Sequence, residues 1–210
     1  MGFFMKKRSK TNIEEKLSSI KKSPINEPKV SQESPFEPHL SFKVLLIGHD
    51  DSGHISSLEN FGNSWFKSNT KLTIGISFEV KEIQIESLNI KLQIWDLATQ
   101  DQWRDLVPKY CRGALGAILI FDVANTESLH QLSPWIEIIK TNTANIPMIL
   151  MGNLDASMRP RMVSAEEALD FVRSEGLNGY FESNIVQEKK LEHIFESLTR
   201  LIIKRYEKIN

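Results

Sequence analysis

Residues 43–55 read KVLLIGHDDSGHI, and this stretch decides the fold expected for the rest of the chain. The apolar run 44–47 has the length of one buried parallel strand, and it leads directly into a loop bounded by Gly48 and Gly53. That is the frame of the phosphate-binding loop G-x-x-x-x-G-K-[ST]. In this loop backbone N–H groups surround phosphate oxygens, the lysine reaches the terminal phosphates and the hydroxyl binds Mg²⁺. Here His54 stands at the lysine position and Ile55 at the hydroxyl position, so the frame is present without its two most important side chains.

Beyond the loop, strand patterns and helix patterns alternate, which favours a mostly parallel sheet covered on both faces. A helix is expected over 56–66, and the alternating runs 76–85 and 89–96 are expected to pair as an antiparallel hairpin. The continuous apolar runs 117–121 and 148–151 are typical of central parallel strands, and a last strand is expected near 180–181. We therefore predict an α/β, three-layer P-loop fold with six strands, five of them parallel.

Helix boundaries are indicated by local signals. Ser133 before Pro134 predicts a helix start with Ser133 as N-cap. Ser164 and Glu167 have the spacing of a capping box, and Gly176 is expected to end that helix. The final helix is expected to bury one apolar stripe, formed by Leu191, Ile194, Phe195, Leu198 and Ile202.

Polar residues and a glycine follow the apolar strands at five places. These residues are Gly48, Asp96, Asp122, Asn153 and Glu182. In open α/β sheets ligands bind in the crevice at the carboxyl ends of the strands. The sequence therefore predicts a ligand site at this edge of the sheet.

Composition sets the class of protein. The 210 residues are 40% hydrophobic and 25% charged, with a formal net charge of −1, which is typical of a single globular domain and gives no reason to expect a nucleic-acid partner. No apolar run approaches the ~20 residues that span a bilayer. The single cysteine, Cys111, fits a reducing compartment and is interpreted as an ordinary core residue. We expect a cytoplasmic protein.

Residues 1–40 are expected to form a disordered tail before a domain at 41–210, because this segment is rich in Pro, Ser, Lys and Glu. A short helix over 11–20 is compatible with its apolar spacing. Apolar residues 3–5 followed by the basic residues of 6–10 offer peripheral contact with an anionic membrane surface, although a solvated start is the simpler interpretation. The chain ends KIN, so no prenylated cysteine is expected.

Over residues 42–205 the chain resembles a Ras-superfamily small GTPase, most closely the Rab branch. The resemblance rests on TIGISFEV at 73–80, LQIWDLATQ at 92–100 and YCRGALGAILIFDVANTESL at 110–129. It also rests on the numbers of residues from Gly53 to Thr73, from Thr73 to Asp96 and from Asp96 to Gly113. It implies that GTP or GDP with Mg²⁺ occupies the crevice.

The resemblance also implies roles for individual residues. Thr73 and Asp96 match the residues that hold Mg²⁺, and Gln100 matches the glutamine that orients the attacking water. Phe66 matches an aromatic residue that covers the guanine ring, while Asn153 and Asp155 match the residues that read its edge. The phosphate region corresponds to Gly48, Asp51, Ser52, Gly53, His54, Ile55 and Thr99.

Departures from the family pattern gather in the same site. Besides His54 and Ile55, Asp50 and Asp51 add negative charge near the phosphates, and Thr99 replaces a glycine. Leu154 replaces the lysine of the base motif, Asp155 stands one position early, and Asn184-Ile185-Val186 replaces the S-A-K segment.

We interpret the chain as a pseudo-GTPase in which nucleotide binding is weak or lost and which contacts a protein effector or complex partner through its switch-like faces. The exposed contact candidates are Ile74, Ile76, Phe78, Trp95, Trp103 and Tyr110. Partial burial of Trp95 and Tyr110 is an equally acceptable interpretation. Two alternatives stay open: an active GTP-binding switch with slow hydrolysis, and a crevice that binds another small anion.

Overall fold

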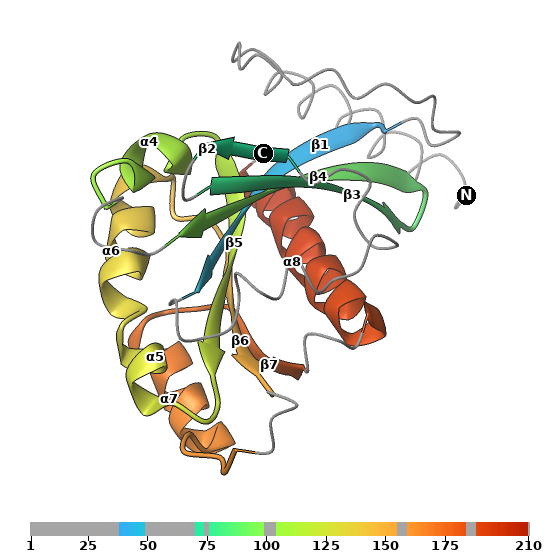
Figure 1. Ribbon diagram of the computed structural model, residues 1–210. Helices are drawn as coiled ribbons and strands as arrows, with labels where there is room; N and C mark the ends of the chain where they lie inside the picture. Colours follow the sequence, from blue (N-terminus) through green and yellow to red (C-terminus); the bar gives the residue numbers. More distant parts are fainter. Residues whose placement is uncertain are drawn as a thin grey trace.

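The computed structural model describes residues 38–48, 70–73, 76–98, 104–154, 159–183 and 188–209. Its strands are β1 (Leu40–Gly48), β2 (Thr70–Thr73), β3 (Ile76–Ile85), β4 (Leu88–Ala98), β5 (Ala114–Asp122), β6 (Met148–Asn153) and β7 (Gly179–Ser183). Its helices are α4 (Val107–Cys111), α5 (Thr126–His130), α6 (Ser133–Asn142), α7 (Ala165–Ser174) and α8 (Glu188–Ile209) (Figure 1). The predicted N-terminal tail and the predicted helix over 56–66 lie outside the described residues.

All the strands form one sheet in the order β2-β3-β4-β1-β5-β6-β7. The strand that precedes the glycine loop, β1, lies between β4 and β5 and is parallel to both. The predicted hairpin is present, since β3 pairs antiparallel with β4 over its whole length. The predicted six-stranded, mostly parallel sheet is confirmed, and β2 adds a short seventh strand beside β3. The sequence gives little sign of β2 because its four residues, TKLT, contain only one apolar side chain.

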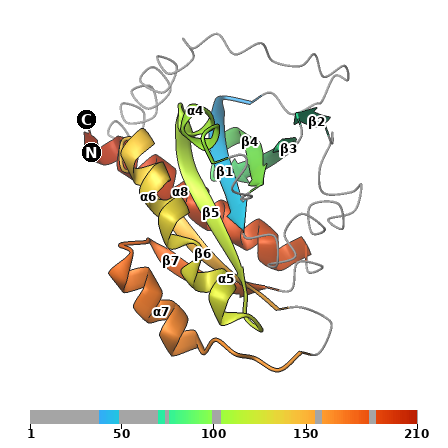
Figure 2. The ribbon, with the colours of Figure 1, turned by 60° about the vertical axis from the view of Figure 1, so that its left-hand side comes forward.

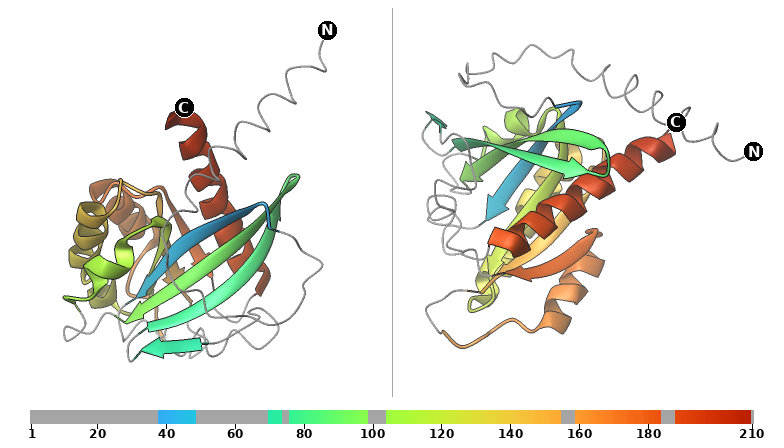
Figure 3. Two further views of the ribbon diagram at one scale, coloured as in Figure 1. Left: turned by 90° about the horizontal axis from the view of Figure 1, so that it is seen from above. Right: turned by 90° about the vertical axis from the view of Figure 1, so that its right-hand side faces the viewer.

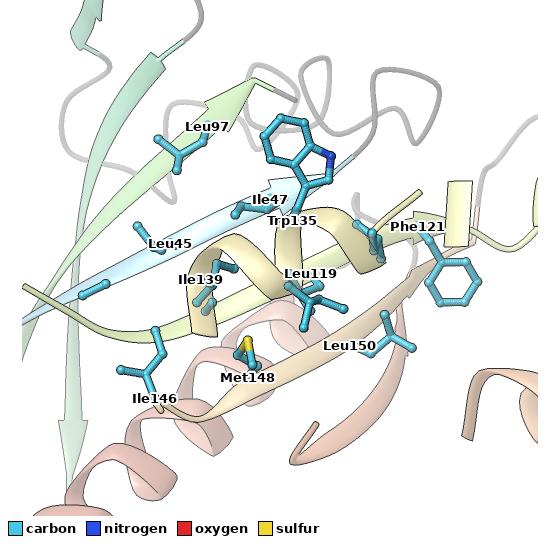
Figure 4. Packing of buried hydrophobic residues seen from close by; sticks show 14 of the residues in the cluster. Leu45, Ile47, Leu97, Leu119, Phe121, Trp135, Ile139, Ile146, Met148 and Leu150 are labelled. Carbon is cyan, nitrogen blue, oxygen red and sulfur yellow. The ribbon is translucent and has the colours of Figure 1, made fainter. Parts of the chain in front are cut away.

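Two hydrophobic clusters cover the two faces of the sheet. Along β1, Val44 and Leu46 face α8, whereas Leu45 and Ile47 face α4, α5, α6 and α7. Figures 2 and 3 show α8 on the opposite side of the sheet from α6 and α7. The close-up in Figure 4 shows strand residues of the cluster that contains Leu45 and Ile47, packed against Trp135 and Ile139 of α6. A parallel strand buried on both faces explains why the sequence of β1 is a continuous apolar run.

The last helix, α8, buries the predicted stripe: Leu191, Ile194, Phe195, Leu198 and Ile202 are each at most 2% exposed. A glycine at position 116 permits this close packing, because a Cβ there would lie 2.9 Å from Ile202 Cδ1 and 3.0 Å from Leu198 Cδ1. The guanidinium of Arg205 donates hydrogen bonds to the backbone oxygens of Ala144 and Asn145, which ties the far end of α8 to the turn before β6. None of the helices in the described ranges is long and apolar enough to cross a membrane.

One predicted helix boundary is confirmed and another is wrong. The Ser164 side chain accepts a hydrogen bond from Glu167 N at 3.1 Å, and Gly176, with φ +62°, follows the end of α7. Ser133 does not cap α6. It is the first residue of the helix, Leu132 occupies the cap position, and Ser133 Oγ donates to Glu175 Oε1 at 2.6 Å. The Ser-Pro signal located the start of α6. It could not show that the Ser133 hydroxyl donates to a carboxylate that is distant in the sequence.

Candidate functional site

The predicted strand-end residues lie at one edge of the sheet. Gly48 ends β1, Asp96 lies near the end of β4, and Asp122 is paired with Asn153 across β5 and β6. On the next pair of strands, Gly152 of β6 is in register with Glu182 of β7. The parallel registers therefore bring residues that are far apart in the sequence to the edge of the sheet where ligands bind in open α/β folds.

Most of the predicted phosphate, base and hydrolysis residues lie outside the described residues. These are Asp51, Ser52, Gly53, His54, Ile55, Phe66, Thr99, Gln100 and Asp155, together with Ile74 and Trp103 of the predicted contact faces. Of the predicted metal residues, Thr73 is the last residue of β2 and pairs with Ile76, and Asp96 is buried near the end of β4. Their assignment to nucleotide, metal and partner remains a prediction.

A second buried acid, Glu79 on β3, accompanies Asp96. Glu79 is 1% exposed and Asp96 is 7% exposed. Burial, and secondarily the charge of Asp96, raises the pKa of Glu79 to about 7. Within the described part of the chain, Glu79 Oε2 accepts no hydrogen bond. Glu79 was not among the predicted site residues, because a charged residue in an alternating edge-like strand gives no signal of burial.

The buried carboxylate of Asp122 is balanced by an arginine that the sequence did not single out. Arg159 Nη2 donates to Asp122 Oδ2 at 2.5 Å, and Asp122 Oδ1 accepts from Ala124 N at 2.8 Å. The side chain of Asp122 is 1% exposed, whereas that of Arg159 is 49% exposed. The arginine therefore approaches from the surface and neutralises an acid at the end of the interior strand β5.

Glu182, at the end of β7, is also fully engaged. The two terminal nitrogens of the Arg161 guanidinium, Nη1 and Nη2, donate to it at 2.9 and 2.6 Å, and Tyr180 Oη donates at 2.5 Å. The hydrogen bonds from Arg161 hold the pKa of Glu182 below its usual value. A Cβ at Gly152 would lie 2.9 Å from Tyr180 Oη, so a larger residue there would displace the tyrosine. We infer that Glu182 is a structural member of this edge and not a ligand group.

Two of the predicted exposed contact residues are buried. Phe78 is 6% exposed and Trp95 is 8% exposed, and their rings meet edge to face at a centroid distance of 5.5 Å. Tyr110, which is half-buried, lies 6.0 Å from Trp95. The expectation of exposure was wrong for Phe78, whereas burial of Trp95 and Tyr110 had been the alternative interpretation. The strand pair β3–β4 turns the rings of Phe78 and Trp95 toward the helices that follow. Ile76, also half-buried, packs against the same cluster.

Trp95 also contacts a buried lysine. Lys43 Nζ lies 4.2 Å from the centre of the Trp95 ring and donates to the backbone oxygen of Arg112 at 3.1 Å. Burial lowers the pKa of Lys43 to about 8. Cys111, at the end of α4, is fully buried, which confirms its interpretation as a core residue. The lysine thus fastens the end of α4 to the sheet beneath the switch-like face.

The donor atoms near Asp96 fit a hard divalent cation, because carboxylate oxygens are the ligands that Mg²⁺ and Ca²⁺ prefer. An orphaned oxygen of a buried glutamate nearby strengthens this fit. The described residues contain no group of three or more His, Cys, Asp or Glu side chains arranged to hold a metal ion. A cation at this place would therefore need water or a bound ligand to complete its coordination.

The sequence of the chain is similar to those of known proteins. A family model described as Ras family matches residues 43–204. The chain is 34% identical over 170 residues to Ras-related protein RABA4b of Arabidopsis thaliana, covering 80% of this chain and 75% of the relative. It is 32% identical over 163 residues to Ras-related protein Rab-13 of Canis lupus familiaris, covering 77% and 80% respectively. It is 30% identical over 175 residues to Ras-related protein Rab-19 of Xenopus laevis, covering 83% and 81%.

Proposed function

The chain belongs to the Ras family of small GTPases as a Rab-like member, and from this premise we propose that it binds guanine nucleotide weakly or not at all and acts as a protein-interaction module. The observation that carries the proposal is the pair His54 and Ile55 at the lysine and hydroxyl positions of the phosphate loop. A neutral histidine is too short to reach the terminal phosphates, and an isoleucine offers no oxygen to Mg²⁺.

The added carboxylates act in the same direction. Asp50 and Asp51 stand in the loop where phosphates would come closest. At ~4 Å and an effective dielectric of 20, each contact between like charges costs about 4 kcal/mol before screening. A nanomolar complex is worth about 12 kcal/mol, so a loss of ~5 to 8 kcal/mol leaves ~4 to 7 kcal/mol, which is a dissociation constant between about 10 μM and 1 mM. The loop chemistry is therefore sufficient by itself to remove tight nucleotide binding.

The scaffold, in contrast, is intact. The sheet keeps its registers up to the strand ends at Gly48 and Asn153, and both of its faces are packed. A retained scaffold with an altered loop supports an interaction role through the switch-like faces. The half-buried Ile76 and Tyr110 are the described residues of that face that a partner can reach, with Trp95 beneath them. We propose a protein effector or complex partner there.

A GTP-dependent switch with slow hydrolysis is the second candidate. Asp96 and Asn153 are retained at strand ends where a metal and a base would be held, and Thr73 and Gln100 are retained in the sequence. When bound, GTP with Mg²⁺ would supply the phosphoanhydride that is cleaved. In that case Asp96 would hold the metal through water, and the amide of Asn153 would read the base.

We further propose that the protein is cytoplasmic and touches membranes only peripherally, through the apolar and basic residues at 3–10. Sedimentation with anionic and with neutral vesicles tests this. Binding to neither kind of vesicle would contradict the membrane contact.

Nucleotide content separates the two functions. The purified protein is heat-denatured and the supernatant is chromatographed for GDP and GTP. We expect no co-purified nucleotide, and a stabilisation below ~3 kcal/mol in millimolar GTP with Mg²⁺, because a ligand selective for the native state stabilises it according to its concentration relative to its dissociation constant. Nucleotide near one per chain would refute the proposal and support the switch. A thermal shift with inorganic phosphate alone would instead support a small-anion site.

Restoring the loop is the complementary test. We expect the double substitution His54→Lys and Ile55→Ser to return part of the nucleotide affinity, measured by fluorescence with a labelled GDP. The matched control is His39→Lys, which adds the same charge at an exposed histidine before β1, at the opposite end of that strand. Equal affinities for the control and the double variant would show that the loop is not the cause.

A further inference from the structure

The hydrophobic cluster covered by α8 extends along the hairpin as far as its turn. On β3, Ile83 and Ile85 belong to this cluster, and they are in register with Ile90 and Leu88 of β4. Gln84, which lies between the two isoleucines, points to the other face of the sheet and is exposed. This end of the hairpin is therefore apolar on the side of α8 and polar on the other side.

The flank of α8 that faces the hairpin is also apolar near the end of the helix. Glu192 marks this flank, because it lies 3.8 Å from the ammonium of Lys81 on β3. Three helical turns later the same flank carries Ile203, followed by Tyr206, and both are half-buried against the cluster. We call the following residues the α8–hairpin margin: Ile83, Ile85, Leu88, Ile203 and Tyr206.

The sheet is wide enough on this side of α8 for one more helix. Leu198 and Ile202 of α8 approach Gly116, which places this part of the helix over β5. The strands that follow β5 in this direction are β1, β4 and β3, so β3 lies ~14 Å from β5 at ~4.8 Å per strand. Packed helices have axes about 8–10 Å apart. Among the described helices only α8 covers this face, so there is room for one helix beside it over β4 and β3 (Figure 3).

The N-terminal segment of the chain joins the domain at the same place. His39 N donates to Asn89 O at 2.9 Å, and His39 Nδ1 accepts from Asn89 N at 3.0 Å. The chain therefore enters β1 beside the hairpin turn, next to Leu88 of the margin. Residues 21–38 span up to ~60 Å when extended, so whatever precedes them can reach any part of the margin.

We propose that residues 11–20 dock on the α8–hairpin margin of the same chain as an amphipathic helix. The sequence there, TNIEEKLSSI, places Ile13, Leu17 and Ile20 on one helical face, which would be buried against the margin. A helix of about three turns is marginal alone in water, but a short tether holds it at a millimolar effective concentration. The margin lies at the amino ends of the strands, away from the strand-end site, so the docking goes beyond the proposed function and does not depend on nucleotide.

Amide hydrogen exchange of the full chain, followed by mass spectrometry, tests the docking. We expect the amides of residues 11–20 to exchange at least about tenfold more slowly in the unmodified chain than in Leu17→Asp, which puts a charge into the contact. Ser18→Asp is the matched control, because it adds the same charge one position later, on the polar side of the segment. It should keep the slow exchange. Equal exchange in Leu17→Asp and in the unmodified chain would overturn the proposal.

A second pair of variants tests the surface of the domain. Ile203→Ser should speed exchange in residues 11–20 at least about tenfold. Leu201→Ser, which also shortens a half-buried side chain of α8, should not, because Leu201 lies on the opposite flank with Arg205. Equal effects of the two substitutions would contradict docking at the margin. Slow exchange that depends on protein concentration would assign the segment to a second copy, and slow exchange found only with anionic vesicles would assign it to a membrane. Either result would refute docking within one chain.

Discussion

Replacing Arg159 with alanine should destabilise the domain by an amount that the structure allows us to estimate. The change removes the guanidinium that balances Asp122, whose side chain is 1% exposed. Removing one partner of a buried ion pair costs about 3–5 kcal/mol, whereas exposed pairs contribute about 0.2–1 kcal/mol. Arg159 is itself 49% exposed, so solvent screens the pair and water can reach the acid after the substitution. We therefore expect a loss of ~2 kcal/mol.

The measurement is urea unfolding followed by tryptophan fluorescence, with the melting temperature as a second readout. For a domain of this size ~2 kcal/mol corresponds to a decrease of ~4–8 °C. Arg173→Ala is the matched control, because Arg173 pairs with Asp170 and both side chains are about two-thirds exposed. The control should lose less than ~1 kcal/mol.

A double-mutant cycle with Asp122→Asn tests the electrostatic explanation. If the cost arises from an unbalanced buried charge, Asp122→Asn should recover part of the stability lost by Arg159→Ala, because an amide carries no charge. Equal losses for Arg159→Ala and Arg173→Ala, or a cycle without any coupling between Arg159 and Asp122, would refute the reasoning.

Three further predictions concern the interior. Folding raises the pKa of Glu79 from its ordinary value of 4.5 to about 7. In the presence of a chelator, the stability of the unmodified chain relative to Glu79→Gln should therefore be greatest below pH 4.5 and should fall as the pH rises through 7. Urea unfolding of both proteins at pH 5 and pH 8 checks this, and a constant difference would contradict it. Leu198→Ala, at a position that is 0% exposed, should cost ~2–5 kcal/mol by the same assay, and a cost below ~1 kcal/mol would show that α8 is loosely packed. Cys111 is fully buried and its pKa is raised to about 11 by burial, so a disulfide reagent at pH 8 should label it only after unfolding, and rapid labelling of the native protein would oppose this.

The fold could be predicted because its signals are local or periodic. The apolar run of β1 and the stripe of α8 were sufficient to place both, and the hairpin β3–β4 has the expected limits to within two residues. The errors concern features that depend on tertiary contacts. The Ser133 hydroxyl donates a hydrogen bond to the carboxylate of a distant residue and does not cap its own helix. The strand β2 forms because it can pair with β3.

The sequence predicted where the site lies, but not which of its charged residues are paired or buried. Periodicity and topology placed Asp96, Asp122 and Asn153 at one edge. They could not show that Arg159 reaches Asp122, since the two are 37 residues apart and neither belongs to a spacing pattern. They also could not show that Glu79 is buried, because exposure of a strand residue is decided by the layer that covers it. Charge pairing across a sheet edge is a property of the assembled chain.

The position of α8 in the chain has a consequence for synthesis. This helix follows every strand, yet it covers the face to which Val44, Leu46 and Ile118 point. While the chain is still being translated, a sheet that has already paired would expose this apolar surface until α8 leaves the ribosome. Nascent chains halted just before Glu188 should therefore be good chaperone clients.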